Sequence, residues 1–175
     1  MKLHKLAIGC LLLCVPLSLN AQSRTKQLET ASVRKFVQAF YDWYAPLAVK
    51  SPTLDLVLKR KPSILSPALA KALRDDLAAE AKSNGDLVGL DFDPFLNSQD
   101  PVSSYKVVSV KKKGMSYLAS VRSAPMPGSD GTLSVIAEVA KSRGRWHFTN
   151  FHYPEGGDLL KELKDLKRSR ANTGK

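Results

Sequence analysis

The sequence predicts an α+β domain in which a curved antiparallel sheet of about four strands packs against two long N-terminal helices, with a further helix at the C-terminus. Apolar residues recur every three or four positions over much of residues 27–83, which is typical of amphipathic helices. From about residue 105 they alternate instead, in two pairs of segments that are each separated by a glycine-containing turn. A leucine-rich segment after residue 158 returns to helical spacing.

Residues 1–21 have the pattern of a secretory signal peptide. Lys2 and Lys5 precede an apolar run over 6–17, which is followed by Leu19-Asn20-Ala21. The run is about a dozen residues long, shorter than the roughly 20 that a membrane-spanning helix needs. We therefore expect cleavage after Ala21 and a periplasmic or secreted protein whose mature chain has no transmembrane segment.

Both cysteines, Cys10 and Cys14, lie inside this predicted signal segment. Cleavage would leave a mature chain, residues 22–175, without disulfides, cysteine catalysis or thiolate metal ligands. Lipidation of one of the cysteines is the alternative to cleavage after Ala21. The remaining length is that of a single domain, and its last residues, about 167–175, form a basic tail.

The first predicted helix covers about residues 27–45, and Pro46 should end or kink it. A short helix or turn is expected over 53–65. Its neighbour, the second long helix, should begin at Ser66-Pro67, an N-cap and first-turn pair, and continue to about residue 83. Asn84-Gly85 is the expected C-terminal stop. The apolar stripes of the two long helices comprise Val33, Phe36, Val37, Phe40 and Tyr44, then Leu69, Leu73 and Leu77.

Two β-hairpins should follow. The first joins residues 105–111 and 116–122 around Lys113-Gly114, and the second joins 132–141 and 145–153 around Arg143-Gly144. A loop with two prolines and two glycines, 124–131, connects them. Gly156-Gly157-Asp158 then opens the terminal helix, whose apolar side consists of Leu159, Leu160, Leu163 and Leu166.

Regular alternation in the last strand predicts which of its side chains share a face. One face would carry Trp146, Phe148, Asn150 and His152, and the other would carry His147, Thr149, Phe151 and Tyr153. The two histidines would then lie on opposite faces and could not ligate one metal ion. For each of them we expect a hydrogen-bonded structural role.

Several segments carry a family resemblance. They are residues 36–44 (FVQAFYDWY), 65–69 (LSPAL), 91–95 (DFDPF), Gln99-Asp100-Pro101, 146–150 (WHFTN) and Tyr153-Pro154. With them the chain resembles, from about residue 30 to 165, a secreted bacterial family of unknown function in the nuclear transport factor two-like, cystatin-like α+β group. The resemblance implies a cone-shaped fold in which a helix pair packs across a strongly bent sheet. Members of this group include enzymes, ligand carriers and binding modules, so the fold does not supply the chemistry.

The aspartate-rich loop over residues 91–100 is the strongest candidate site, because three carboxylates within ten residues can accept bonds from a cationic group. It lacks the glycine and glutamate of an EF-hand. In the structural alternative, Asp93 and Asp100, each followed by proline, make side-chain turns while Phe92 and Phe95 fill the core. The residues predicted to bind a ligand or partner are Trp43, Tyr44, Asp91, Asp93, Gln99, Asp100 and Tyr153.

We expect a non-enzymatic binding domain of the bacterial envelope that recognises a protein partner or small ligand through a curved-sheet pocket and this loop, with no cofactor, metal or catalytic residue. The alternative is a pocket enzyme of the isomerase or dehydratase kind, using a buried carboxylate such as Asp42 or Asp91 with Tyr44. The chain lacks a Gly-x-Ser-x-Gly elbow and glycine-rich phosphate loops.

The chain is basic, and removal of Lys2 and Lys5 lowers its formal charge from +11 to +9. This charge favours anionic partners, including an anionic surface that would contact the basic tail. Nucleic acid is not expected, because the cations are scattered or lie at the ends of elements, such as Lys111-Lys112-Lys113. A homodimer is left open by the sequence.

Overall fold

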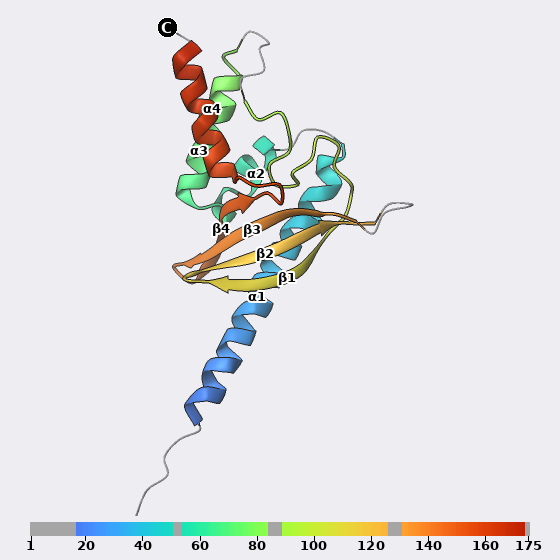
Figure 1. The fold of residues 1–175 in the computed structure, drawn as a ribbon, viewed down its shortest axis with the longest axis vertical. Helices are drawn as coiled ribbons and strands as arrows, with labels where there is room; N and C mark the ends of the chain where they lie inside the picture. Colours follow the sequence, from blue (N-terminus) through green and yellow to red (C-terminus); the bar gives the residue numbers. More distant parts are fainter. Residues whose placement is uncertain (1–16, 51–53, 84–88, 126–130, 174–175) are drawn as a thin grey trace, which may run out of the picture.

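The computed structural model describes residues 17–50, 54–83, 89–125 and 131–173, and its fold is drawn in Figure 1. The elements in chain order are α1 (Leu17–Ala48), α2 (Leu54–Arg60), the 3-10 helix η1 (Pro62–Ile64), α3 (Pro67–Glu80), β1 (Tyr105–Lys113), β2 (Ser116–Ser123), β3 (Leu133–Ser142), β4 (Arg145–His152) and α4 (Leu159–Thr173). The predicted α+β class and four-stranded antiparallel sheet are confirmed. Most of the predicted signal segment, and the predicted stop at Asn84-Gly85, lie outside the described residues.

The sheet is a meander with strand order β1-β2-β3-β4. Both predicted hairpins form. β1, β2 and β3 continue one or two residues past their expected ends, while β3 begins and β4 ends one residue inside the expected range. The strand register skips one residue at three places, which leaves Val108, Ser134 and Thr149 as extra residues. Such β-bulges bend a strand and increase its twist, so they supply curvature to this sheet.

The bulge at Thr149 corrects the predicted faces of β4. Phe148 pairs with Val139 and Phe151 with Ala137, so both phenylalanines enter the core and are fully buried. The prediction that they lie on opposite faces was wrong, because the extra residue between them inverts the alternation.

The same bulge places His147 and His152 on one face of the sheet, paired with Ala140 and Ile136, which corrects their predicted separation to opposite faces. Their partners are four residues apart along β3, so the two imidazoles lie roughly 13 Å apart along the strand direction. That distance is too long for one ion to bridge.

Helix α1 is confirmed but longer than predicted. It begins ten residues earlier, at Leu17, and includes Pro46 near its end. Residues 23–28 are exposed, and the helix becomes buried only where it crosses the sheet. Figure 1 shows α1 running under one face of the sheet and projecting beyond it. Its buried stripe comprises Val33, Val37, Phe40, Tyr41 and Tyr44. Burial of one large apolar side chain stabilises the folded state by about 1.5–3 kcal/mol.

Helix α3 departs from the predicted arrangement, in which both long N-terminal helices pack against the sheet. It packs beside α4, and its main contact with the sheet is at β4 (Figure 1). The start of α3 is fixed to that edge strand, because the Ser66 N–H donates to the Phe148 carbonyl at 2.8 Å. The predicted N-cap is confirmed, since the Ser66 hydroxyl accepts from the Leu69 N–H. Asp158 likewise caps α4 by accepting from the Lys161 N–H.

At the opposite edge of the sheet, side chains of α1 form hydrogen bonds with the backbone of β1. The Gln38 amide donates to the Tyr105 carbonyl at 3.0 Å and accepts from the Val107 N–H at 2.9 Å, as a neighbouring strand would. The Arg34 guanidinium donates to the Val107 carbonyl. These contacts block part of an edge that would otherwise be open to pairing with another chain.

A buried ion pair joins α3 to α4. Asp76 is only 2% exposed, and its carboxylate accepts from Arg170 at 2.6 Å and from the Leu90 N–H at 3.2 Å. The pair therefore links both helices to the segment that follows α3. Removing the cation would leave a buried carboxylate without its charge partner.

We expect Arg170→Ala to lower the free energy of unfolding by about 2–4 kcal/mol, because Asp76 would stay buried without a counter-charge. The matched control is Arg168→Ala, which removes an exposed guanidinium 3.5 Å from Asp165 and should change it by less than about 1 kcal/mol. Urea denaturation followed by circular dichroism measures both. Equal small losses in the two variants would contradict a structural role for the buried pair.

Candidate functional site

The aspartate-rich loop is folded around the side chain of Asp93. One carboxylate oxygen accepts from the Phe95 and Leu96 N–H groups at 3.0 and 3.1 Å, and the backbone of Asp93 pairs with Ser98. Phe95 is fully buried. For Asp93 and Phe95, the structural alternative drawn from the sequence is confirmed: the carboxylate makes a side-chain turn and the ring fills the core.

Three tyrosines anchor this loop to the domain. The Tyr44 hydroxyl donates to the other oxygen of Asp93 at 2.7 Å, while Tyr41 and Tyr153 donate to the carbonyls of Phe95 and Pro94. Burial raises the pKa of Asp93 to about 6, although the bonds from Tyr44 and from the backbone lower it. The structure therefore brings the predicted residues Tyr44, Asp93 and Tyr153 together as an anchor, in which both tyrosines are buried and Asp93 is half-buried.

The other predicted site residues lie at the rim or apart. Asp91, Gln99 and Asp100 are exposed, with the Gln99 amide 3.5 Å from the Asp91 carboxylate. Trp43 is half-buried, and the Lys61 ammonium lies 4.7 Å from its ring centre. An open cavity of about 330 Å³ adjoins the loop, and its lining includes Asn97, Ser98, Asp100, Tyr105 and Glu155.

The enzyme alternative named Asp42 or Asp91 as the base, and both are exposed. Asp42 accepts from Gln38 on the same helix at 2.8 Å. Asp93 has the raised pKa that acid–base chemistry uses, yet both of its oxygens already accept bonds from the protein. Asp93 is also absent from the residues that line the two described cavities. Its arrangement is that of a structural carboxylate.

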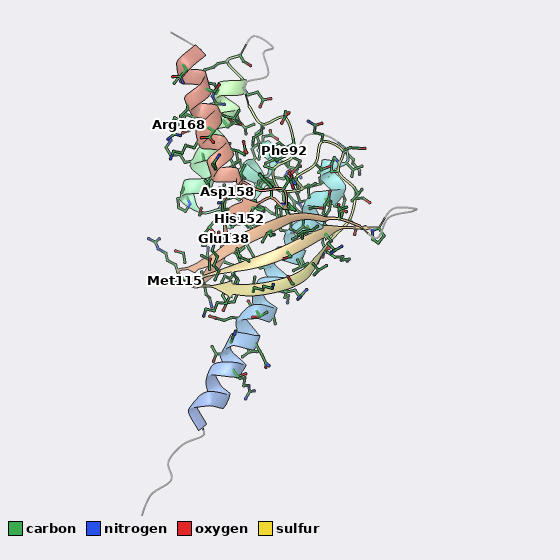
Figure 2. All side chains as sticks on the ribbon, viewed as in Figure 1. Phe92, Met115, Glu138, His152, Asp158 and Arg168 are labelled. Atoms are coloured by element: carbon green, nitrogen blue, oxygen red, sulfur yellow. The ribbon has the colours of Figure 1, made fainter. Side chains whose placement is uncertain are left out.

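A second polar cluster lies on the face of the sheet away from α1. Glu138 accepts from Ser116 at 2.8 Å and lies 2.7 Å from the nearer nitrogen of His152, and Asp158 accepts from Asn150 (Figure 2). Burial raises the pKa of Glu138, but the bonds from His152 and Ser116 hold it below its ordinary value. His152 thus has the hydrogen-bonded structural role expected from the sequence.

The larger cavity, about 590 Å³, lies where the start of α3 meets the β3–β4 hairpin. It is lined by Ser66, Pro67, Ser142, Arg143, Arg145, His147 and Thr149. Arg143 occupies the turn in the left-handed region, with φ of 49°, followed by Gly144 at 77°. Two successive positive φ angles suit a tight hairpin, but the first position normally favours Asn, Asp or Gly.

This cavity has donors without partners. In the part of the chain that the structure describes, neither Arg143 nor Arg145 makes a side-chain hydrogen bond or ion pair. The Nδ1 atom of His147, which is another lining residue, is buried and has no hydrogen-bond partner. No carboxylate is among the described residues that line the cavity. The arrangement suits an anionic group, which a guanidinium binds in bidentate fashion.

Sequence reasoning assigned Arg143-Gly144 only to the turn of the second hairpin and missed the cavity. The signal was present in Arg143-Gly144-Arg145, since arginine is an unfavourable choice for the first turn position. Ser66 was identified only as a helix cap, and nothing in its sequence context indicated that α3 would start beside β4.

Comparison with protein-family models, with curated proteins and with solved structures gives no match to this chain. Within the described residues, no helix has both the length and the apolarity needed to cross a bilayer. In the same residues, no three His, Cys, Asp or Glu side chains are grouped so that they could hold a metal ion. The function is therefore argued from the geometry of the cavity.

The raised pKa of Asp93 predicts a pH dependence of stability. Its folded value of about 6 exceeds the value near 3.9 of an unfolded aspartate, so between them only the folded state holds the proton. This group should therefore make the fold more stable as pH falls from about 7 to about 4, by up to about 3 kcal/mol. Urea denaturation across that range measures the effect.

The control is Asp93→Asn, because carboxylates with lowered pKa values, such as Asp158 and Glu138, change stability in the opposite direction. The difference between the two proteins isolates Asp93. Parallel pH profiles for the wild type and the variant would contradict the burial of this carboxylate.

Proposed function

We propose that the chain is a non-enzymatic binding domain of the bacterial envelope, periplasmic or secreted. It holds an anionic group of a protein partner or small ligand in the larger cavity, where the start of α3 meets the β3–β4 hairpin. The observation that carries the proposal is the pair of unpartnered guanidinium groups, Arg143 and Arg145, beside a cavity of about 590 Å³. The location rests on the signal pattern of residues 1–21. Envelope ligands and partners offer carboxylate and phosphate groups that suit such a site.

We also infer that the fold belongs to the nuclear transport factor two-like group. Support comes from one long helix lying across a bulged antiparallel sheet.

The binding mode differs from the one expected of the aspartate-rich loop. The predicted site residues Tyr44, Asp93 and Tyr153 hold the loop in place, whereas the arginines of the cavity remain available to a ligand.

The electrostatics of the cavity favour binding. Two guanidinium groups two residues apart repel one another, and the left-handed backbone at Arg143 adds strain of roughly 1 kcal/mol or more. An anion between them would relieve the repulsion and satisfy several donors at once. Each charge-assisted bond is worth about 1.5–3 kcal/mol, so two or three such bonds together reach the roughly 4 kcal/mol that corresponds to millimolar affinity.

The test is a titration of the isotope-labelled protein with inorganic phosphate at constant ionic strength, followed by amide chemical shifts. We expect shifts at Ser66, His147 and Thr149. The double variant Arg143→Gln, Arg145→Gln should weaken binding at least about tenfold, because it removes both charged donors.

The matched control is Lys35→Gln, Lys164→Gln, which removes the same charge from exposed positions on α1 and α4. It should bind phosphate like the wild type. Loss of binding in both double variants would reduce the effect to net charge, and the absence of shifts at the cavity in the wild type would refute the assignment of the site.

A further inference from the structure

We propose that the two hairpin tips at one end of the sheet form a surface that docks on an anionic lipid bilayer. This hairpin-tip surface consists of Lys111, Lys112, Lys113, Met115 and Lys141. None of these five residues is among those that line the larger cavity, although Lys141 is next to its lining residue Ser142, and the partner is a different one. The first observation is its position at a free end of the fold.

Both tips lie at the same end because the sheet is an antiparallel meander. The β1–β2 turn and the β3–β4 turn appear together at the left of Figure 1. Neighbouring strands are about 4.8 Å apart, so the tips are separated by roughly 10 Å. A Cβ placed on Gly114 or Gly144 would meet no atom within 4 Å, so both turns have open space at their glycines.

An apolar side chain stands at one apex. Met115 is 93% exposed, and Figure 2 places it at the extreme end of the sheet. Its unbranched thioether chain can enter the boundary between lipid headgroups and acyl chains without a change in the fold. A methionine that closely follows three lysines is therefore suited to a partner with charged groups at its surface and an apolar layer beneath them.

The lysines around Met115 keep most of their charge directed to solvent. The ion pairs of Lys112 and Lys113 are long, at 3.9 Å from Glu29 and 4.0 Å from Glu138, and both lysine side chains are about half exposed. The Lys112 ammonium also lies 5.6 Å from the centre of the Tyr117 ring. Lys111 is exposed, and Lys141 lies over the Trp146 ring. Each basic side chain near an anionic leaflet should strengthen partitioning about fivefold.

The C-terminal tail, the segment first expected to contact an anionic surface, has less charge available. Lys161 and Arg168 pair with Asp165, and Lys167 lies 3.6 Å from Asp75. Arg170 is committed to the buried Asp76. These contacts leave the hairpin-tip surface as the better basic patch among the described residues.

The course of α1 supports the same orientation. Glu29 accepts from the Tyr117 hydroxyl and lies near Lys112, which places it beside the hairpin tips. The exposed segment 23–28 of α1 therefore leaves the sheet at this end, with Arg24, Lys26 and the 64% exposed Leu28. Basic and apolar side chains of α1 thus extend the surface that the tips begin.

A lipid bilayer fits these features better than a soluble polyanion, because a polyanion offers charge but no apolar phase for Met115. Flotation with vesicles tests the proposal. The chain beginning at Gln22, which retains the buried stripe of α1 described above, is mixed with phosphatidylcholine vesicles that contain roughly one-third phosphatidylglycerol or none. We expect binding to the anionic vesicles only, weakening as salt increases.

Two variants locate the surface. Lys111→Gln, Lys112→Gln, Lys113→Gln should reduce partitioning by about a hundredfold, and Met115→Ser should reduce it severalfold without changing its salt dependence. The matched control, Lys164→Gln, Lys167→Gln, Arg168→Gln, removes the same charge from α4 and should retain most of the binding. Circular dichroism confirms folding of each protein.

Equal losses in the two triple variants would overturn the proposal, because net charge alone would then explain the binding. Undiminished binding of the hairpin variant would overturn it as well. Full binding by Met115→Ser, together with displacement of the vesicles by soluble polyglutamate at equal charge, would identify a polyanion rather than a bilayer as the partner.

Discussion

The domain depends on the contact between the aromatic stripe of α1 and the bulged sheet. The ring of Phe40 stacks on Tyr44 at 5.1 Å and touches Phe148 at 4.9 Å and Phe95 at 5.5 Å, so one side chain joins the helix, β4 and the loop. This arrangement requires both phenylalanines of β4 on the inner face. The bulge at Thr149 places them there, and a regular strand would have left one of them outside.

Much of the fold was predictable because its signals are local. Glycine-containing turns between alternating segments defined both hairpins, and Ser66-Pro67 marked the start of α3. The folding of the loop around Asp93 followed from an aspartate before a proline, with aromatic residues beside it. In each case a few neighbouring residues determine the backbone, so no distant contact had to be known.

The features that sequence reasoning missed depend on distant contacts. A bulge leaves the local pattern almost unchanged, since polar Thr149 fits either face, and only the register with β3 reveals it. The packing of α3 on α4 depends on the Asp76–Arg170 pair, whose members are 94 residues apart. The cavity is assembled from the start of α3 and the β3–β4 hairpin, and its residues are separated in the sequence by the first hairpin and the aspartate-rich loop.

The basic composition did not show which basic segment faces an anionic partner, and the distribution of charge in the structure narrows the choice. On α4 the cations lie one helical turn from carboxylates or face Asp75 on α3, so most of their charge is neutralised within the domain. Cations at the hairpin tips are compensated less, because a two-residue turn has no neighbouring element beyond it. Lys112 and Lys113 approach a carboxylate no closer than 3.9 Å, and Lys111 forms no ion pair within the described residues. For a chain whose core is otherwise well satisfied, such concentrated and weakly compensated charge is the feature that the fold itself does not require.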